Sequence, residues 1–219
     1  MQKLTTLALK RNRLGDEAIQ YIAEELRQNS TLKLLDLRDN RIGEKGAQYL
    51  AEALRNNTQT LTKLELQKNN SGYCSAVGAA IGIRNDKSLI TLDLSGEGID
   101  DNGAQYIADA LRNNTVSHDA LSAFFLFITT LTILDLSGQE INHKGAEHLA
   151  NVLQNNKTLT TLGLRDNNIG DVGAQHLASG IRNNTTLCTV DLSFNPIGNE
   201  GIQHLADALR NNKGSDDEE

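Results

Sequence analysis

Three histidines recur 28 residues apart, at His148, His176 and His204. Histidine is the commonest metal ligand among the side chains, so a regular histidine column raises the question of a metal site. Each histidine lies in a segment with helical periodicity, and neighbouring packed helices are about 8–10 Å apart. Zinc–nitrogen bonds are only about 2.1 Å long, which argues against one ion being shared by neighbouring helices of this column. The same column holds aromatic rings in earlier segments, at Tyr21, Tyr49 and Tyr106. The sequence therefore predicts no metal site.

No other arrangement of residues indicates catalysis. The sequence lacks a recognisable nucleophile–base pair, a glycine-rich phosphate loop and a metal-binding motif. Its glycines recur with the same spacing as the histidines. We therefore expect a protein that is not an enzyme, with no cofactor and no small-molecule substrate.

Carboxylates form a second column, between alternating leucines. This column reads Ala8, Asp36, Glu65, Asp93, Asp135, Gly163 and Asp191, so five of seven positions are acidic. The next column, which carries some balancing positive charge, reads Lys10, Arg38, Gln67, Ser95, Ser137, Arg165 and Ser193. On adjacent strands, about 5 Å apart, the like charges would repel one another. There are two interpretations of this column. Its acidic residues belong to a common form of the repeat and are simply solvated, or they line a groove for a partner with a basic surface. The predicted partner-binding residues are Asp36, Arg38, Glu65, Asp93, Asp135, Arg165, Asp191 and Phe194.

These columns exist because the chain repeats itself. The motif L-x-x-L-x-L-x-x-N-x-I begins seven times, at Leu4, Leu32, Leu61, Leu89, Leu131, Leu159 and Leu187. The steps are 28 or 29 residues, except for one of 42 residues. We expect one repeat domain over residues 1–212, followed by an acidic tail over 213–219.

The long step contains an insertion at about residues 116–129. It holds Phe124, Phe125 and Phe127, three of the four phenylalanines of the chain. Aromatic residues concentrated in this way often contact a partner, so we predict a contact at the rim of the sheet. Two alternatives are that the insertion extends or follows the fourth helix and folds onto apolar surface, or that it is a genomic insertion.

Each repeat has a strand half and a helix half. Leu35 and Leu37 alternate as in a strand, whereas Ala47, Leu50 and Leu54 follow helical spacing. Acidic or amide residues that can cap the helix stand ahead of it at Asp16, Asp101, Asp171 and Asn199. The asparagine pairs that follow the helices are expected to form left-handed turns.

Stacked repeats bury apolar faces that one repeat cannot bury alone. Strands pack more closely than helices, so the stack should curve, with the parallel sheet on the concave face and the helices outside. A ladder of buried asparagines is predicted at Asn12, Asn40, Asn69, Asn167 and Asn195. Glu97 and Gln139 replace asparagine in repeats 4 and 5, and a looser or wetter turn is expected at Glu97. Repeat 3, with Gly78, Ala79 and Gly82 in its helix, should bury less area and be the least stable.

The pattern LxxLxLxxNxIGxxGAxxLAxxLRNN resembles the leucine-rich repeat of the ribonuclease-inhibitor type over residues 4–212. That type is found in ribonuclease inhibitor, in NOD-like receptors and in Ran GTPase-activating protein. The resemblance implies an α/β solenoid, a right-handed horseshoe of seven strand–helix repeats. It also implies a non-enzymatic protein-binding scaffold that uses its concave face. The alternatives are a GTPase-activating regulator similar to Ran GTPase-activating protein, or an inhibitor that clamps an enzyme.

Charge and cysteine content restrict the partner and the compartment. The net charge is −7, and no basic stripe of the kind typical of nucleic-acid binders occurs. We therefore expect a protein partner and no nucleic acid. There is no signal peptide and no apolar run long enough to cross a membrane. Cys74 and Cys188 lie several repeats apart, so we expect reduced thiols and a cytoplasmic location.

Overall fold

The computed structural model describes residues 4–55, 60–112 and 131–211, and strands alternate with helices throughout these ranges. The strands have three residues each and the helices 11 to 14. In chain order the elements are β1 (Thr6–Ala8), α1 (Asp16–Leu26), β2 (Leu34–Asp36), α2 (Glu44–Leu54), β3 (Lys63–Glu65), α3 (Gly72–Asn85), β4 (Thr91–Asp93), α4 (Asp101–Arg112), β5 (Ile133–Asp135), α5 (His143–Leu153), β6 (Thr161–Gly163), α6 (Gly170–Arg182), β7 (Thr189–Asp191) and α7 (Asn199–Asn211).

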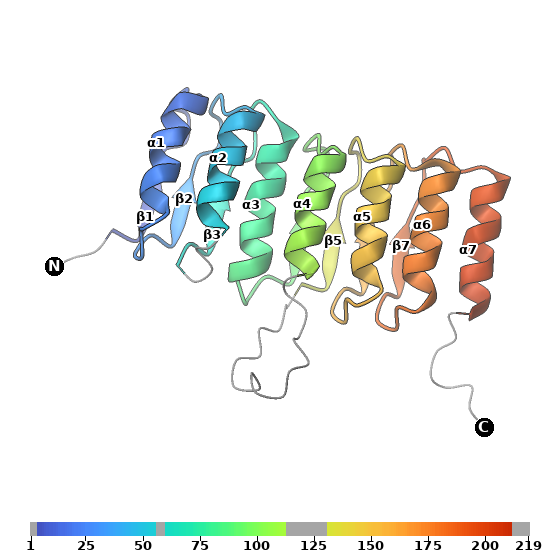
Figure 1. Ribbon diagram of the computed structural model, residues 1–219. Helices are drawn as coiled ribbons and strands as arrows, with labels where there is room; N and C mark the ends of the chain where they lie inside the picture. Colours follow the sequence, from blue (N-terminus) through green and yellow to red (C-terminus); the bar gives the residue numbers. More distant parts are fainter. Residues whose placement is uncertain (1–3, 56–59, 113–130, 212–219) are drawn as a thin grey trace, which may run out of the picture.

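The helices form one layer and the strands the other (Figure 1). This arrangement confirms the predicted α/β solenoid of seven strand–helix units with parallel strands. The parallel strands are divided into two sheets, β1-β2-β3 and β4-β5-β6-β7, with no pairing between β3 and β4. We call the surface on the strand side of the solenoid the strand face.

The core lies between the two layers. Leu35, Leu37 and Leu50 are completely buried, as their alternating and helical spacings require. The buried residues form two clusters, one over repeats 1 to 3 and one over repeats 3 to 6, and α3 contributes to both. The division of the core therefore falls close to the division of the sheet.

The predicted asparagine ladder is present, with Asn40 and Asn167 buried, Asn69 and Asn195 partly buried and Asn12 exposed. Asn167 is 5% exposed, and its Oδ1 accepts a hydrogen bond from the Ile141 N–H at 3.1 Å. Its Nδ2 donates to the carbonyls of Leu136 and Leu164 at 2.9 and 3.1 Å. Gln139 takes this place in repeat 5, because its longer amide has the same donor and acceptor groups. Its Oε1 accepts the Ile99 N–H, and its Nε2 donates to the carbonyls of Leu94 and Ser137.

Glu97 interrupts this ladder. A carboxylate cannot donate to the strand carbonyls, and Glu97 instead accepts a hydrogen bond from the Ser75 hydroxyl at 2.7 Å. The interruption lies between β3 and β4, where the two sheets separate. The loss of the bridging amide thus coincides with the loss of strand pairing.

The aspartates expected to cap their own helices have a different role. Asp16 is the first residue of α1, and its Oδ1 accepts a hydrogen bond from the Gly43 N–H, at the start of α2, at 2.7 Å. Asp101 and Asp171 likewise accept two N–H bonds each from the start of the following helix. Each carboxylate therefore binds the free N–H groups of the next repeat and stabilises the stacking.

The asparagines after the helices also differ from expectation, because they do not adopt left-handed backbone conformations among the described residues. Asn184 is 2% exposed, and its Oδ1 accepts the N–H groups of Thr186 and Leu187 at 2.9 and 2.7 Å. Its Nδ2 donates to the Leu153 carbonyl of the preceding repeat. These residues therefore form Asx turns that link neighbouring repeats.

The helix of repeat 3 is more buried than expected, not less. Nine residues of α3 are buried, against six in α2. A Cβ added at Gly78 would lie 2.6 Å from the Leu64 carbonyl oxygen of β3. The small side chains let α3 approach the strand backbone, so a larger share of its residues is buried than in α2. The lower buried area and lower stability expected for repeat 3 stay predictions.

Candidate functional site

The residues of the acidic column lie in register on the strand face. Asp36 pairs with Glu65 across β2 and β3, and Asp93 pairs with Asp135 across β4 and β5. Gly163 follows Asp135 on β6, and Asp191 lies opposite Gly163 on β7. The strand break separates the two groups, so the predicted set is not one continuous row.

The aspartates of this column have a local structural role that the sequence argument missed. Asp93, Asp135 and Asp191 each accept, through Oδ1, the N–H of the serine two residues later, at 2.9 Å. Asp36 accepts the Arg38 N–H in the same way at 3.1 Å. These bonds hold the bend that follows each strand. The recurring Asp-x-Ser motif in the sequence indicates this turn.

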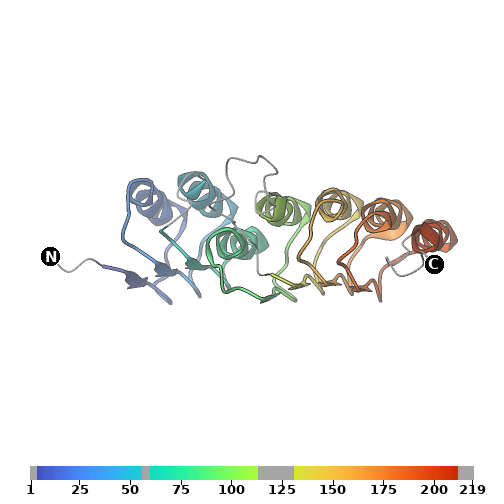
Figure 2. The same cartoon turned by 90° about the horizontal axis from the view of Figure 1, so that it is seen from below.

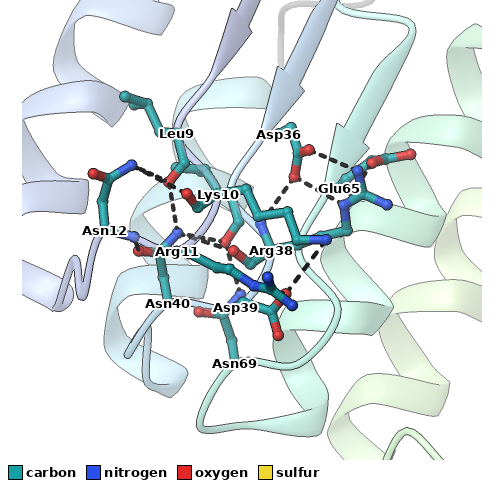
Figure 3. Close-up of polar contacts among 11 residues, drawn as sticks. Leu9, Lys10, Arg11, Asn12, Asp36, Arg38, Asp39, Asn40, Glu65 and Asn69 are labelled. Carbon is teal, nitrogen blue, oxygen red and sulfur yellow. Dashed lines mark hydrogen bonds and ion pairs between the residues drawn. The ribbon is translucent and has the colours of Figure 1, made fainter.

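In the first sheet the acidic side chains are neutralised by neighbouring cations (Figure 3). Arg38 donates from Nε and Nη2 to the Asp36 carboxylate at 2.9 and 2.7 Å, and Nε also lies 2.8 Å from Glu65. Lys63 pairs with Glu65 at 2.7 Å. The Arg38 side-chain hydrogen bonds hold the pKa of Asp36 below its usual value. The expected repulsion between Asp36 and Glu65 is therefore relieved within the protein.

In the second sheet, Asp93 and Asp135 lack such partners. Among the described residues, neither Asp93 nor Asp135 makes an ion pair, and Asp93 is exposed. Hydrogen bonds from the backbone and side chain of Ser95 lower the pKa of Asp93, so the carboxylate remains charged at neutral pH. Two neighbouring negative charges are therefore left on β4 and β5.

Phe194 and Arg165 lie together at the end of the second sheet. The Arg165 guanidinium carbon lies 4.1 Å from the centre of the Phe194 ring, within the range of a cation–π interaction. Phe194 is 71% exposed, and its φ of 58° is unusual for a bulky residue. The backbone conformation belongs to the repeat, because the same turn position has a positive φ at Arg11, Asp39, Lys68, Gly96, Gly138, Asp166 and Phe194.

Other predicted features are placed differently or lie outside the described ranges. Phe124, Phe125 and Phe127, the insertion at 116–129 and the tail at 213–219 are outside the described residues. His148, His176 and His204 are partly buried on three successive helices. No cluster of three potential metal ligands occurs among the residues that the structure describes. Within the same residues, no helix has the length and apolar character needed to cross a bilayer.

Known structures with a similar arrangement are distant in sequence. The actin-binding site 2 of leiomodin-1 is 17% identical, with 95% of this chain and 80% of that chain covered and a TM-score of 0.36. Internalin C2 from Listeria monocytogenes is 26% identical, with 92% and 76% covered and a TM-score of 0.41. The tropomodulin C-terminal domain from Caenorhabditis elegans is 14% identical, with 89% and 92% covered and a TM-score of 0.43. No curated protein matches the sequence.

A family model gives the decisive match. The model described as Leucine Rich repeat matches residues 1–23, 28–51, 85–108, 128–150, 155–178 and 183–206, which together make up more than half of the chain. The matches leave out residues 52–84, where repeat 3 departs from the common pattern and α3 lies against β3. The remaining repeats have the expected strand and helix. The chain therefore belongs to the leucine-rich repeat family.

Proposed function

We propose that this protein is a non-enzymatic scaffold that binds a partner protein through the second sheet of its strand face. Leucine-rich repeat proteins commonly act in protein–protein interaction, and stacked repeats offer an extended surface for it. The observation that carries the proposal is the pair Asp93 and Asp135, which lie in register on adjacent strands without an ion-pair partner in the described part of the chain.

The charges of this pair define the kind of partner. Adjacent parallel strands are about 4.8 Å apart, so two neighbouring carboxylates repel each other even where water screens them. A lysine or arginine of a partner placed between Asp93 and Asp135 would relieve this repulsion. A cationic partner would stabilise the first sheet less, because Arg38 and Lys63 already form ion pairs with Asp36 and Glu65.

The pair formed by Phe194 and Arg165 adds an aromatic anchor beyond the acidic pair. Aromatic and arginine side chains are enriched among the residues that contribute most to binding energy at interfaces. The exposed Phe194 ring, covered on one face by Arg165, would pack against apolar atoms of the partner. We therefore place the interface over β4 to β7, with charge at one end and an aromatic ring at the other.

The sequence motifs support a repeat of the ribonuclease-inhibitor type and a cytoplasmic location. Each described unit pairs one short strand with a full helix, as the resemblance to that type implies. The two cysteines are free thiols, which is typical of a reducing compartment. We propose both assignments together with the binding role.

A photo-crosslinking experiment identifies the partner and the face it uses. Benzoylphenylalanine replaces Thr161 on β6, and in a control chain it replaces the exposed Gln175 on α6. The proposal expects a partner that crosslinks at the strand position and not at the helix position. Crosslinking at the helix position alone would contradict it.

Charge variants then test the mechanism with the identified partner. Asp93→Asn with Asp135→Asn removes both charges and keeps the Oδ1 acceptors of the two turns. We expect affinity to fall roughly tenfold and its dependence on salt to decrease. Glu17→Gln with Glu147→Gln removes the same charge from exposed helix positions and should leave binding unchanged. Equal weakening by the two double variants would show that only net charge matters and would refute the proposal.

A further inference from the structure

The helix α3 lies closer to the strands than its neighbours α2 and α4 do (Figure 2). In the repeat alignment, Val77 and Ile81 of α3 occupy the positions of Gln48 and Glu52 in α2. Gln48 and Glu52 are exposed, whereas Val77 and Ile81 are 0% and 1% exposed. The helix thus buries the side that other repeats turn to solvent.

The recessed helix leaves a groove on the helical surface between α2 and α4. Its volume is about 400 Å³. Residues of three helices line it, among them Glu44 and Glu52 of α2, Tyr73 of α3, Tyr106 and Asp109 of α4, together with Arg55, which follows α2. The groove lies on the helix side of the solenoid, opposite the strand face.

Two tyrosine rings meet in this groove. The ring centres of Tyr73 and Tyr106 are 5.7 Å apart, and the rings are tilted by 58°. Arg84 already binds Tyr106, with its guanidinium carbon 5.6 Å from the ring centre and its Nη2 donating to the hydroxyl at 3.2 Å. Burial raises the pKa of Tyr73 to about 12, so its hydroxyl is neutral at physiological pH.

The charged lining is predominantly acidic. Glu44, Glu52 and Asp109 line the groove, and Arg55 is the only cationic residue among the described residues that do so. Asp109 pairs with Arg112 at 2.8 Å. Within the described ranges, Glu44 and Glu52 make no ion pair, although Glu44 accepts a hydrogen bond from Gln48. Two carboxylates beside two aromatic rings are suited to a cationic side chain.

We propose that this groove binds an arginine or lysine side chain of a partner protein. The aliphatic stem packs against Tyr73 and Tyr106, and the cationic group lies near Glu44 and Glu52. This second surface is independent of the strand face, so either site stands if the other fails.

The test uses the whole chain and a minimal probe. The chain has four tyrosines, of which Tyr21 and Tyr49 lie outside the groove and serve as internal references. Tyrosine-labelled protein is titrated with N-acetyl-arginine N-methylamide, and ring resonances are followed by NMR. We expect saturable shifts at Tyr73 and Tyr106 and none at Tyr21. The neutral isostere N-acetyl-citrulline N-methylamide should bind more weakly.

Variants separate a specific site from general charge attraction. Glu44→Gln with Glu52→Gln should weaken probe binding about threefold to tenfold, as expected for the loss of two partly exposed charge contacts. Glu24→Gln with Glu147→Gln, at exposed positions outside the groove, should leave it unchanged. The inference is overturned if the groove tyrosines do not shift, if all four shift together, or if citrulline binds equally well. If the resonances of the groove tyrosines change with protein concentration in the absence of the probe, the groove binds a second copy of this chain, and this result also overturns the inference.

Discussion

Two glycines of α3 should respond in opposite directions to the same substitution. A Cβ at Gly78 would lie 2.6 Å from the Leu64 carbonyl oxygen, whereas a Cβ at Gly82 would lie 3.5 Å from its nearest neighbour, a methyl group of Leu89. Both glycines are inside the same helix, so alanine improves helix propensity by about 1 kcal/mol at each position. Only Gly78 faces the backbone of β3.

The magnitudes follow from these contacts. At Gly82 the propensity gain is unopposed, so Gly82→Ala should raise the free energy of unfolding by about 0.5–1 kcal/mol. At Gly78 the new methyl group must push α3 away from β3, and such overpacking costs about 1–3 kcal/mol. After the propensity gain, Gly78→Ala should lower the free energy of unfolding by about 1 kcal/mol. The two variants should therefore differ by about 2 kcal/mol.

Urea unfolding followed by circular dichroism measures both variants, and hydrogen exchange of the α3 amides locates the change. Gly180→Ala extends the comparison, because Gly180 occupies the Gly82 position in α6, where a Cβ would lie 2.6 Å from the Ala150 carbonyl oxygen. We expect Gly180→Ala to destabilise the protein. The packing argument is refuted if Gly78→Ala is as stable as Gly82→Ala or more stable.

Three further predictions concern single features of the structure. Asn167→Ala should lower the free energy of unfolding by about 3 kcal/mol, because it leaves buried backbone groups unpaired. Thermal or urea unfolding measures this change, and a decrease of less than about 1 kcal/mol would contradict the role of the ladder. The pKa of Asp36 is depressed, so its stabilising contribution is present above its unfolded pKa of about 3.9 and is lost as pH falls through the folded value. Arg38→Met should raise the Asp36 pKa in a carboxyl NMR titration, and an unchanged value would count against the pairing. Burial raises the pKa of Cys74 to about 12 whereas Cys188 is exposed, so a thiol reagent should label Cys188 alone in the native protein and both cysteines after unfolding.

The sequence alone determined the repeat architecture, because local spacing encodes it. Alternating leucines such as Leu35 and Leu37 can bury only one side of a strand, and Ala47, Leu50 and Leu54 can bury only one stripe of a helix. The ladder residue Asn167 was equally readable, since one amide in each repeat has to satisfy the backbone groups of the bend.

Only the tertiary structure decided which neighbour each polar side chain serves. Asp16 is the first residue of α1 but accepts a hydrogen bond from the N–H of Gly43 at the start of α2, because stacking of the repeats brings that free group close. Arg38 forms ion pairs with both Asp36 and Glu65, so these two negative charges are balanced in the first sheet. Asp93 and Asp135 of the second sheet make no ion pair in the described part of the chain.

The position of α3 was likewise beyond the reach of sequence reasoning. The glycines of α3 predict a lower intrinsic stability of this helix. Whether small side chains leave a void or allow closer packing depends on what lies opposite them. Gly78 lies opposite the Leu64 carbonyl, and the absence of a side chain allows α3 to pack closely against it. In this position of α3, Val77 and Ile81 are buried. Because α3 lies closer to the strands than α2 and α4 do, a groove remains on its outer side between these two helices.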